Sequence, residues 1–210
     1  MCGIVGYVGP KRAAPILLDG LRRLEYRGYD SAGVALVDGG TIRVHKEVGK
    51  VAMVQAEVPA DAPGHTGIAH TRWATHGSVT QANAHPHTDM QMGIAVVHNG
   101  IIDNDAALRV RLAAEGVEFC SETDTEVLPH LIRHHYKGDP TQAVIDALKE
   151  VRGTYGVVVA FADHPGVMVA ARLGSPLVIG LGEDENFIAS DPHALVRYTR
   201  RVIYLEDHEL

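Results

Sequence analysis

Two reactive groups coincide on the second residue of this chain, which opens with Met1-Cys2-Gly3-Ile4. If the initiator methionine is removed, Cys2 carries both a thiol that can attack a carbonyl carbon and an α-amine that can take the thiol proton. An unperturbed thiol has a pKa of about 8.5 and an α-amine one of about 7.7 to 8.0, so this proton transfer is nearly balanced. Cys2 is therefore a candidate nucleophile that brings its own base. The alternative interpretation is a buried strand that begins with a small apolar residue.

Acyl transfer also requires hydrogen-bond donors for the developing oxyanion and groups that hold the substrate. Asn99-Gly100, which follows an apolar run, can supply a side-chain amide N–H and a backbone N–H directed at one point. Taken alone, the same pair is typical of a two-residue turn. Arg72 can bind a carboxylate through two parallel hydrogen bonds, and Asp124 can receive an ammonium group. Each charge, considered alone, is also consistent with a solvated or helix-capping residue.

The histidines of the central third offer a competing metal site. His85 and His87, joined by His70 or His98 from neighbouring strands, could place three nitrogen ligands around zinc. These histidines form no i, i+4 pair on a helix and have no glutamate motif beside them. We therefore expect histidines in a polar network, with no metal and no cofactor.

Composition restricts the class of protein. With 210 residues, of which 46% are hydrophobic, the chain is long enough for one globular domain with a substantial core. Two cysteines exclude a disulfide framework and favour a reducing compartment, so we expect a cytoplasmic protein. A net charge of −7 without lysine or arginine runs argues against nucleic acid as a partner. No apolar run approaches the roughly 20 residues that span a bilayer, and a secretory signal is absent, so we expect no membrane partner.

These candidate residues must be positioned by short strands and amphipathic helices. Apolar residues at three- and four-residue steps predict helices, and short apolar runs bounded by glycine and proline predict strands. The predicted helices cover residues 12–24, 51–57, 104–115, 121–135 and 139–151, with a further short helix near residues 193–196. The predicted strands cover residues 2–8, 33–37, 41–46, 67–70, 93–98, 155–161, 167–171, 177–181, 187–189 and 202–205. Because tight turns join antiparallel strands and no βαβ alternation is sustained, the pattern predicts an α+β layered domain.

Two predicted segments bear directly on the candidate residues. Residues 71–91 are long, polar and aperiodic, and they hold the only tryptophan, Trp73, which favours a functional loop over disorder. Thr123 and Glu126 match a capping box at the start of the helix over 121–135. Pro129 falls inside that helix, so we expect a kink or a later start.

Six strings of this sequence, in order, resemble the glutaminase domain of the glucosamine-6-phosphate synthase family, a branch of the class II glutamine amidotransferases. The resemblance runs from Cys2 to the end of the chain, and the strings around Tyr26 and Trp73 point to this branch in particular. The six strings are Met1-Cys2-Gly3-Ile4-Val5-Gly6, Leu24-Glu25-Tyr26-Arg27-Gly28-Tyr29-Asp30-Ser31-Ala32-Gly33, His70-Thr71-Arg72-Trp73-Ala74-Thr75-His76-Gly77, Asn83-Ala84-His85-Pro86-His87, His98-Asn99-Gly100 and Ser121-Glu122-Thr123-Asp124-Thr125-Glu126.

The resemblance implies an N-terminal-nucleophile hydrolase fold over residues 1–210, a four-layer α/β/β/α sandwich with two antiparallel sheets. It implies L-glutamine as the substrate and Cys2 as the nucleophile, with a thioester intermediate. The oxyanion would be held by Asn99 and the N–H of Gly100. The resemblance further implies that Arg72, with Thr75 and His76, binds the α-carboxylate of glutamine and that Asp124 binds its α-amine. Trp73 would belong to a mobile loop that covers the site and directs ammonia. Arg27 and Asp30 would be supporting residues near the N-terminus.

The resemblance also implies a larger enzyme. The family's sugar-phosphate isomerase domain, which uses the ammonia to make glucosamine 6-phosphate from fructose 6-phosphate, is absent from this sequence, and the chain is expected to stop short of the usual end of the glutaminase domain. This chain alone should then release glutamate and ammonia and make no amino sugar. A homodimer formed through the full enzyme is a further implied partner. The alternatives from other classes are a non-catalytic amino-acid-binding or regulatory module and a zinc amidohydrolase.

Overall fold

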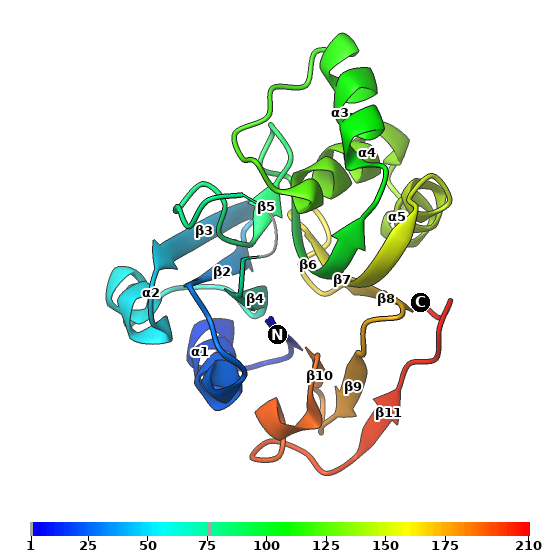
Figure 1. Ribbon diagram of the computed structural model, residues 1–210. Helices are drawn as coiled ribbons and strands as arrows, with labels where there is room; N and C mark the ends of the chain where they lie inside the picture. The colour runs from blue at the N-terminus through cyan, green and yellow to red at the C-terminus, as the bar shows by residue number, and fades with distance from the viewer. Residues whose placement is uncertain (1, 75–76) are drawn as a thin grey trace.

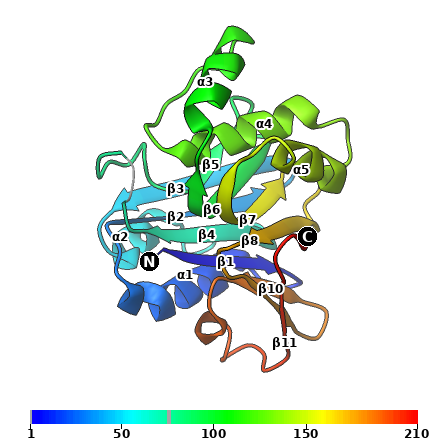
Figure 2. The same cartoon turned by 45° about the vertical axis from the view of Figure 1, so that its right-hand side comes forward.

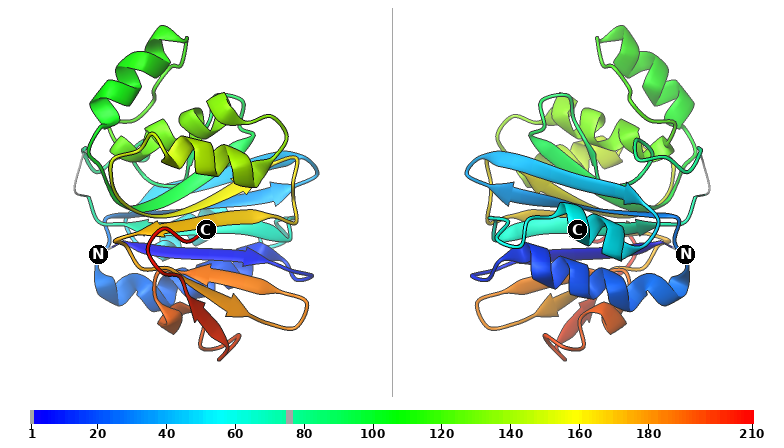
Figure 3. Two further views of the ribbon diagram at one scale, coloured as in Figure 1. Left: turned by 90° about the vertical axis from the view of Figure 1, so that its right-hand side faces the viewer. Right: turned by 90° about the vertical axis from the view of Figure 1, so that its left-hand side faces the viewer.

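Two antiparallel β-sheets stack face to face between two layers of helices (Figures 1 and 3). This computed structural model describes residues 2–74 and 77–210. The first strand runs through the middle of the stack, and the N-terminus lies at one edge of the layers (Figure 3). The predicted α+β fold with two antiparallel sheets between helical layers is confirmed.

The larger sheet carries the N-terminal strand. Its strands are β1 (Gly3–Val8), β2 (Ser31–Asp38), β3 (Thr41–Val48), β4 (Thr66–Arg72), β9 (Val178–Leu181), β10 (Asn186–Ala189) and β11 (Val202–Tyr204). Within the described residues, these seven strands lie in the order β11-β9-β10-β1-β4-β2-β3. β1 pairs with β10 on one side and with β4 on the other, which places Gly3 opposite Thr71 and Ile4 opposite His70. The start of the chain is therefore held at the centre of a sheet, whereas most chain termini fray.

The smaller sheet carries Asn99 and Gly100. Its strands, as far as the described residues go, are β5 (His87–Thr88), β6 (Ile94–Ile102), β7 (Gly153–Phe161) and β8 (Met168–Leu173), in that order across the sheet. β6 and β7 pair along their whole length, and Asn99 lies opposite Gly156 and Gly100 opposite Tyr155.

Helices cover the outer faces of both sheets (Figures 2 and 3). Helices α1 (Ala13–Leu24) and α2 (Val51–Glu57) pack on the larger sheet, and α4 (Val127–His135) and α5 (Pro140–Leu148) pack on the smaller one. Helix α3 (Asp105–Ala114) projects beyond the layers (Figure 2) and is attached through its buried Leu108 and Leu112. Short 3-10 turns, η1 (Glu25–Arg27), η2 (Asp124–Glu126) and η3 (Pro192–Ala194), complete the described elements.

Side-chain alternation along the strands builds a core at each interface between layers. On β4, Ala69 packs toward the α1 layer and its neighbour Ile68 packs between the sheets. On β6, Val96 packs toward the outer helices and Val97 packs between the sheets. Because successive side chains of a strand point to opposite faces, this pattern fixes the direction of every later residue of each strand.

Most predicted elements are confirmed, and α2 has the predicted bounds. The predicted cap of α5 is also confirmed, since the Asp139 side chain accepts a hydrogen bond from the N–H of Gln142 at 3.1 Å. The strand predicted to end at residue 98 runs on to Ile102. Asn99 and Gly100 therefore lie inside a paired strand, and the interpretation of this pair as a turn is wrong.

The predicted capping box is wrong as well. Thr123 makes no side-chain cap bond, and the Glu126 carboxylate accepts instead from the backbone N–H groups of Cys120 and Ser121, at 2.7 and 2.8 Å. Helix α4 starts at Val127, later than the box indicates. Pro129 thus falls in its first turn, where no intrahelical hydrogen bond is lost.

In the part of the chain that is described, the longest helix has 12 residues, and none combines the length and apolarity needed to cross a membrane.

Candidate active site

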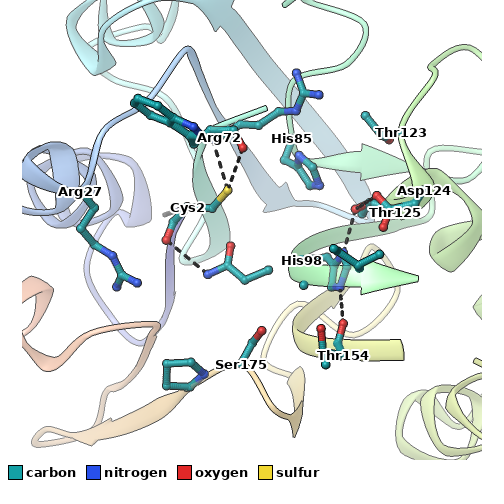
Figure 4. Close-up of a pocket in the computed structure, with 15 residues that line it drawn as sticks. Cys2, Arg27, Arg72, His85, His98, Thr123, Asp124, Thr125, Thr154 and Ser175 are labelled. Carbon is teal, nitrogen blue, oxygen red and sulfur yellow. Dashed lines mark hydrogen bonds between the residues drawn. The ribbon is translucent and has the colours of Figure 1, made fainter. Parts of the chain in front are cut away.

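A pocket of about 450 Å³ opens where the start of β1, the end of β4 and the end of β6 meet. Strand alternation explains why reactive side chains gather there. Cys2 shares the inward direction of Ile4, and Arg72 that of Ile68, on the larger sheet. On the opposing sheet, Asn99 shares the inward direction of Val97. The pocket is lined by Cys2, Arg27, Arg72, Trp73, His85, His98, Asn99, Gly100, Ile101, Thr123, Asp124, Thr125, Thr154, Ser175 and Pro176 (Figure 4).

The sulfur of Cys2 is bound by the backbone of Trp73. The Trp73 N–H donates to Cys2 Sγ at 3.2 Å, and Sγ lies 3.6 Å from the Trp73 carbonyl oxygen, close enough for the thiol to donate to it. Burial raises the pKa of the Cys2 thiol above its ordinary value, and the Trp73 N–H acts in the opposite direction. Burial favours the neutral thiol, whereas the peptide donor favours the thiolate.

The Asn99 amide reaches the same residue from the opposing sheet. Its Nδ2 donates to the Cys2 carbonyl oxygen at 3.4 Å, joining two residues that are 97 positions apart. The next residue, Gly100, has φ +136°, and a Cβ built there would lie 2.0 Å from the Thr154 carbonyl oxygen. Only glycine fits this position, because both the backbone angle and the close approach of β7 exclude a side chain.

Arg72 is buried at the edge of the pocket and held in place. Its side chain is 4% exposed, and its Nη1 donates to the Ser78 carbonyl oxygen at 3.2 Å and lies 3.8 Å from Asp30 Oδ1. Asp30 also ties the surrounding backbone together, since its N–H donates to the Arg72 carbonyl oxygen at 2.7 Å and its carboxylate accepts from the Ala74 N–H. These contacts fix the position of the Arg72 guanidinium group at the edge of the pocket.

Asp124 lies at the start of η2, on the side of the pocket away from Arg27 (Figure 4). It is 8% exposed. One of its carboxylate oxygens accepts from the Ile102 N–H at 2.8 Å and the other from the Thr125 hydroxyl at 3.4 Å. A buried carboxylate that lines a pocket and keeps acceptor capacity can bind a cationic group of a ligand.

Arg27 and Trp73 flank the site. Arg27 donates to the Ser190 carbonyl oxygen at 3.4 Å and lies 3.7 Å from an Asp191 carboxylate oxygen. The Trp73 side chain is 52% exposed. Its ring occupies the space where Gly28, with φ +86°, would carry a Cβ, which would fall 2.4 Å from the ring. The structure thus brings Cys2, Asn99, Gly100, Arg72, Asp124, Trp73 and Arg27 around one pocket, with Asp30 behind Arg72.

Two candidate residues, Thr75 and His76, lie outside the described residues. The histidines of the competing zinc interpretation are buried. The rings of His70 and His85 stack with centroids 4.3 Å apart, and the ring of His87 meets that of His85 edge-on with centroids 4.7 Å apart. Over residues 2–74 and 77–210, however, no three His, Cys, Asp or Glu side chains are grouped so that they could hold a metal ion. The described residues therefore give the zinc interpretation no support.

Sequence reasoning gave several pocket residues another role or none, and it considered His85 and His98 only as zinc ligands. His98 points away from the sheet interface, as Val96 does, and its Nδ1 lies 2.8 Å from the Thr125 hydroxyl and its Nε2 3.2 Å from the Thr154 carbonyl oxygen. The alternation of β6 could have indicated this direction once its inward face was known. Thr123 was considered only for the capping box, and no role was predicted for the remaining lining residues, which are Ile101, Thr125, Thr154, Ser175 and Pro176.

Comparisons of the sequence identify a family. Residues 70–197 match the family described as a glutamine amidotransferase domain. The glutamine–fructose-6-phosphate aminotransferase (isomerizing) of Thermus thermophilus is 57% identical over 211 residues, which is 100% of this chain and 35% of the relative. The protein of the same description from Aquifex aeolicus is 52% identical, over 100% of this chain and 36% of the relative. The chain thus spans about a third of the length of these curated relatives.

Solved structures share the fold. A glutamine phosphoribosylpyrophosphate amidotransferase from B. subtilis has a TM-score of 0.81 at 29% identity, over 97% of this chain and 44% of that chain. A glutamine aminotransferase class-II domain protein from Silicibacter pomeroyi has a TM-score of 0.62 at 18% identity, over 98% of this chain and 92% of that chain. At that lower identity, the likeness concerns the fold alone.

Proposed function

This chain belongs to the glutamine amidotransferase domain family, and from that premise we propose that it hydrolyses L-glutamine to glutamate and ammonia with Cys2 as the nucleophile. One observation carries the proposal: the Cys2 sulfur, the Asn99 amide and two buried charged side chains, Arg72 and Asp124, converge on one pocket. A nucleophile, an oxyanion donor and a pair of opposite charges are the groups that amide hydrolysis of an amino acid requires.

In the proposed reaction, Met1 has been removed and the α-amine of Cys2 is free. The thiol adds to the side-chain carbonyl carbon of glutamine and gives its proton to that amine, while Asn99 Nδ2–H and the Gly100 N–H hold the oxyanion. The protonated amine then supplies a proton to the leaving nitrogen, the C–N bond breaks and ammonia departs from a glutamyl thioester. Water adds to the thioester, the C–S bond breaks, and glutamate leaves with Cys2 restored.

The charged side chains would orient the substrate. Arg72 binds the α-carboxylate and Asp124 the α-ammonium group, each through charge-assisted hydrogen bonds. Their positions, Arg72 at the end of β4 and Asp124 at the start of η2, favour an amino acid that lies across the pocket with its side chain toward Cys2. Thr75 and His76 remain proposed helpers of Arg72, Trp73 a proposed cover of the site, and Arg27 and Asp30 proposed supports.

We further propose that the ammonia serves a larger enzyme. The relatives are described as isomerizing glutamine–fructose-6-phosphate aminotransferases, and this chain matches about a third of their length. The proposed fate of the ammonia is therefore transfer to fructose 6-phosphate in a sugar-phosphate isomerase domain, in a homodimeric enzyme. The two cysteines, both unpaired, favour a cytoplasmic location.

Product analysis tests the proposed glutaminase directly. The chain, with Cys2 verified as its first residue, should release equal amounts of glutamate and ammonia from glutamine. Asn99→Ala should lower kcat about 100- to 1000-fold with glutamine binding retained, because one oxyanion donor is lost. A binding module would bind glutamine without forming product. A zinc amidohydrolase would lose activity to a chelator and regain it with zinc.

A further inference from the structure

The buried histidine of β4, His70, contacts the Asn99 side chain but has no part in the chemistry proposed above. His70 is fully buried and points from the larger sheet toward the smaller one. Its Nε2 lies 3.0 Å from Asn99 Oδ1 and 3.1 Å from the His98 carbonyl oxygen. The two neighbours come from consecutive residues of β6, so a single imidazole nitrogen faces the backbone and the side chain of the opposing strand.

The backbone contact determines where the His70 proton lies. A carbonyl oxygen can only accept, so Nε2 must carry hydrogen to bond with His98. The same N–H then faces the Asn99 amide, where an acceptor fits and an NH₂ group would be repelled. The amide is therefore turned with Oδ1 toward His70, and its Nδ2 is left facing Cys2, whose carbonyl oxygen it reaches at 3.4 Å.

The surroundings of His70 keep this donor unchanged. Burial lowers the pKa of His70 to about 3, so the imidazole is neutral near pH 7. The ring of His85 stacks on it with centroids 4.3 Å apart. Within the described residues, the other ring nitrogen of His70 has no hydrogen-bond partner, so nothing there draws the proton away from Nε2.

We propose that His70 is a positioning residue, which donates from Nε2 to Asn99 Oδ1 and thereby holds the Asn99 N–H groups toward the oxyanion formed at Cys2. This inference rests on the proposed glutaminase function. A flipped Asn99 amide would present its oxygen lone pairs to the oxyanion, replacing attraction by repulsion at the point where negative charge develops. His70 thus contributes to stabilisation of the transition state through Asn99, without touching the substrate.

Substitutions at His70 test the role by separating kcat from KM. His70→Leu and His70→Met both remove the hydrogen-bond donor and fill the space of the imidazole with an apolar side chain. In His70→Gln, by contrast, the new side chain can place an amide N–H near the position of Nε2. In the full chain with Cys2 first, we expect both donorless variants to lose about 10- to 100-fold in kcat, with KM for glutamine within about twofold. His70→Gln should stay within about fivefold of the unsubstituted kcat.

A double substitution separates positioning from a general structural role. If His70 acts only through Asn99, then His70→Leu should cause no further loss of kcat in an Asn99→Ala background, since the group it orients is gone. Alkylation of Cys2 by iodoacetamide, which forms no oxyanion, should proceed at the same rate in every His70 variant that folds. Thermal unfolding identifies the variants that fold. If His70→Leu does not fold, the comparison of kcat between His70→Gln and His70→Met tests the positioning role instead.

Three results would each overturn the positioning role. They are full kcat in His70→Leu and His70→Met, a His70→Gln variant no more active than those two, and a His70→Leu substitution that lowers kcat further in the Asn99→Ala background. Failure of the proposed function gives a different pattern. In that case the unsubstituted chain would form no glutamate, or Cys2→Ala would retain turnover, whatever residue stands at position 70.

Discussion

The backbone N–H of Trp73 lies 3.2 Å from the sulfur of Cys2, although the two residues are 71 positions apart. This contact places a peptide donor against the candidate nucleophile, and it also links the nucleophile to the segment that carries Arg72. A movement of the Trp73 segment would therefore change the electrostatics of the thiol and the position of the guanidinium group together.

The pH dependence of thiol alkylation reports this environment. Burial raises the pKa of the Cys2 thiol and outweighs the Trp73 donor, so less thiolate is present at neutral pH than for an exposed cysteine. In a Cys120→Ser chain that retains Met1, we expect the rate of iodoacetamide alkylation to keep rising beyond about pH 9. A profile that levels off below about pH 8 would show that the peptide donor, and not burial, dominates.

The elements that carry the site could be predicted from local pattern, whereas the contacts that complete it could not. Short apolar runs predicted β1 and β4, and apolar residues at three- and four-residue steps predicted α1, each close to its observed bounds. The position of Asn99 within a paired strand depends on β7, which follows more than 50 residues later. The bond between Trp73 and Cys2 forms only when β1 pairs with β4, and the contact of His70 with Asn99 forms only when the two sheets stack, so no local spacing predicts either contact.

Removing the charge of Asp124 should weaken substrate binding more than chemistry. Asp124→Asn keeps an oxygen that can accept from the Ile102 N–H but loses the charge that would attract an α-ammonium group. A charge-assisted hydrogen bond contributes about 1.5 to 3 kcal/mol, so we expect KM for glutamine to rise roughly 10- to 100-fold with kcat within about threefold. The surface substitution Asp146→Asn is the matched control. An unchanged KM in Asp124→Asn would remove Asp124 from the substrate site.

A methyl group at Gly100 should disrupt both fold and turnover. Its Cβ would lie 2.0 Å from the Thr154 carbonyl oxygen, and its φ of +136° is unfavourable for any other residue. Gly116→Ala isolates the backbone strain, because φ is +92° there and no atom lies within 4 Å of the added Cβ. We expect Gly116→Ala to lose about 1 kcal/mol of unfolding free energy and keep glutaminase activity. Gly100→Ala should lose more unfolding free energy than Gly116→Ala, and most of its activity. Equal losses of unfolding free energy in the two variants would contradict the close approach of β7 to Gly100.

Acid should destabilise the protein through its buried histidines before the carboxylates titrate. Burial lowers the pKa of His70 to about 3 and those of His85, His87 and His98 below their ordinary value of 6.5, with the nearby Arg72 adding to the effect on the first three. The unfolded chain then binds more protons than the folded one as the pH falls below 6.5, so stability declines in that direction. From about pH 7.5 to about pH 5.5, each such histidine should cost up to about 1.4 kcal/mol.

Urea unfolding at several pH values measures this loss. His70→Gln should reduce the loss by the contribution of one histidine, because glutamine does not titrate. An unfolding free energy that is constant between about pH 7.5 and about pH 5.5 would show that these imidazoles are not buried in neutral form.

The central claim is that Cys2 serves as nucleophile and its own α-amine as base, and turnover by two forms of one sequence tests it most directly. One form begins at Cys2 and the other retains Met1, with both first residues verified by intact mass. We expect the Cys2 form to release glutamate and ammonia from glutamine, and the form with Met1, whose Cys2 nitrogen is locked in an amide, to release neither. Equal turnover by the two forms would contradict the claim.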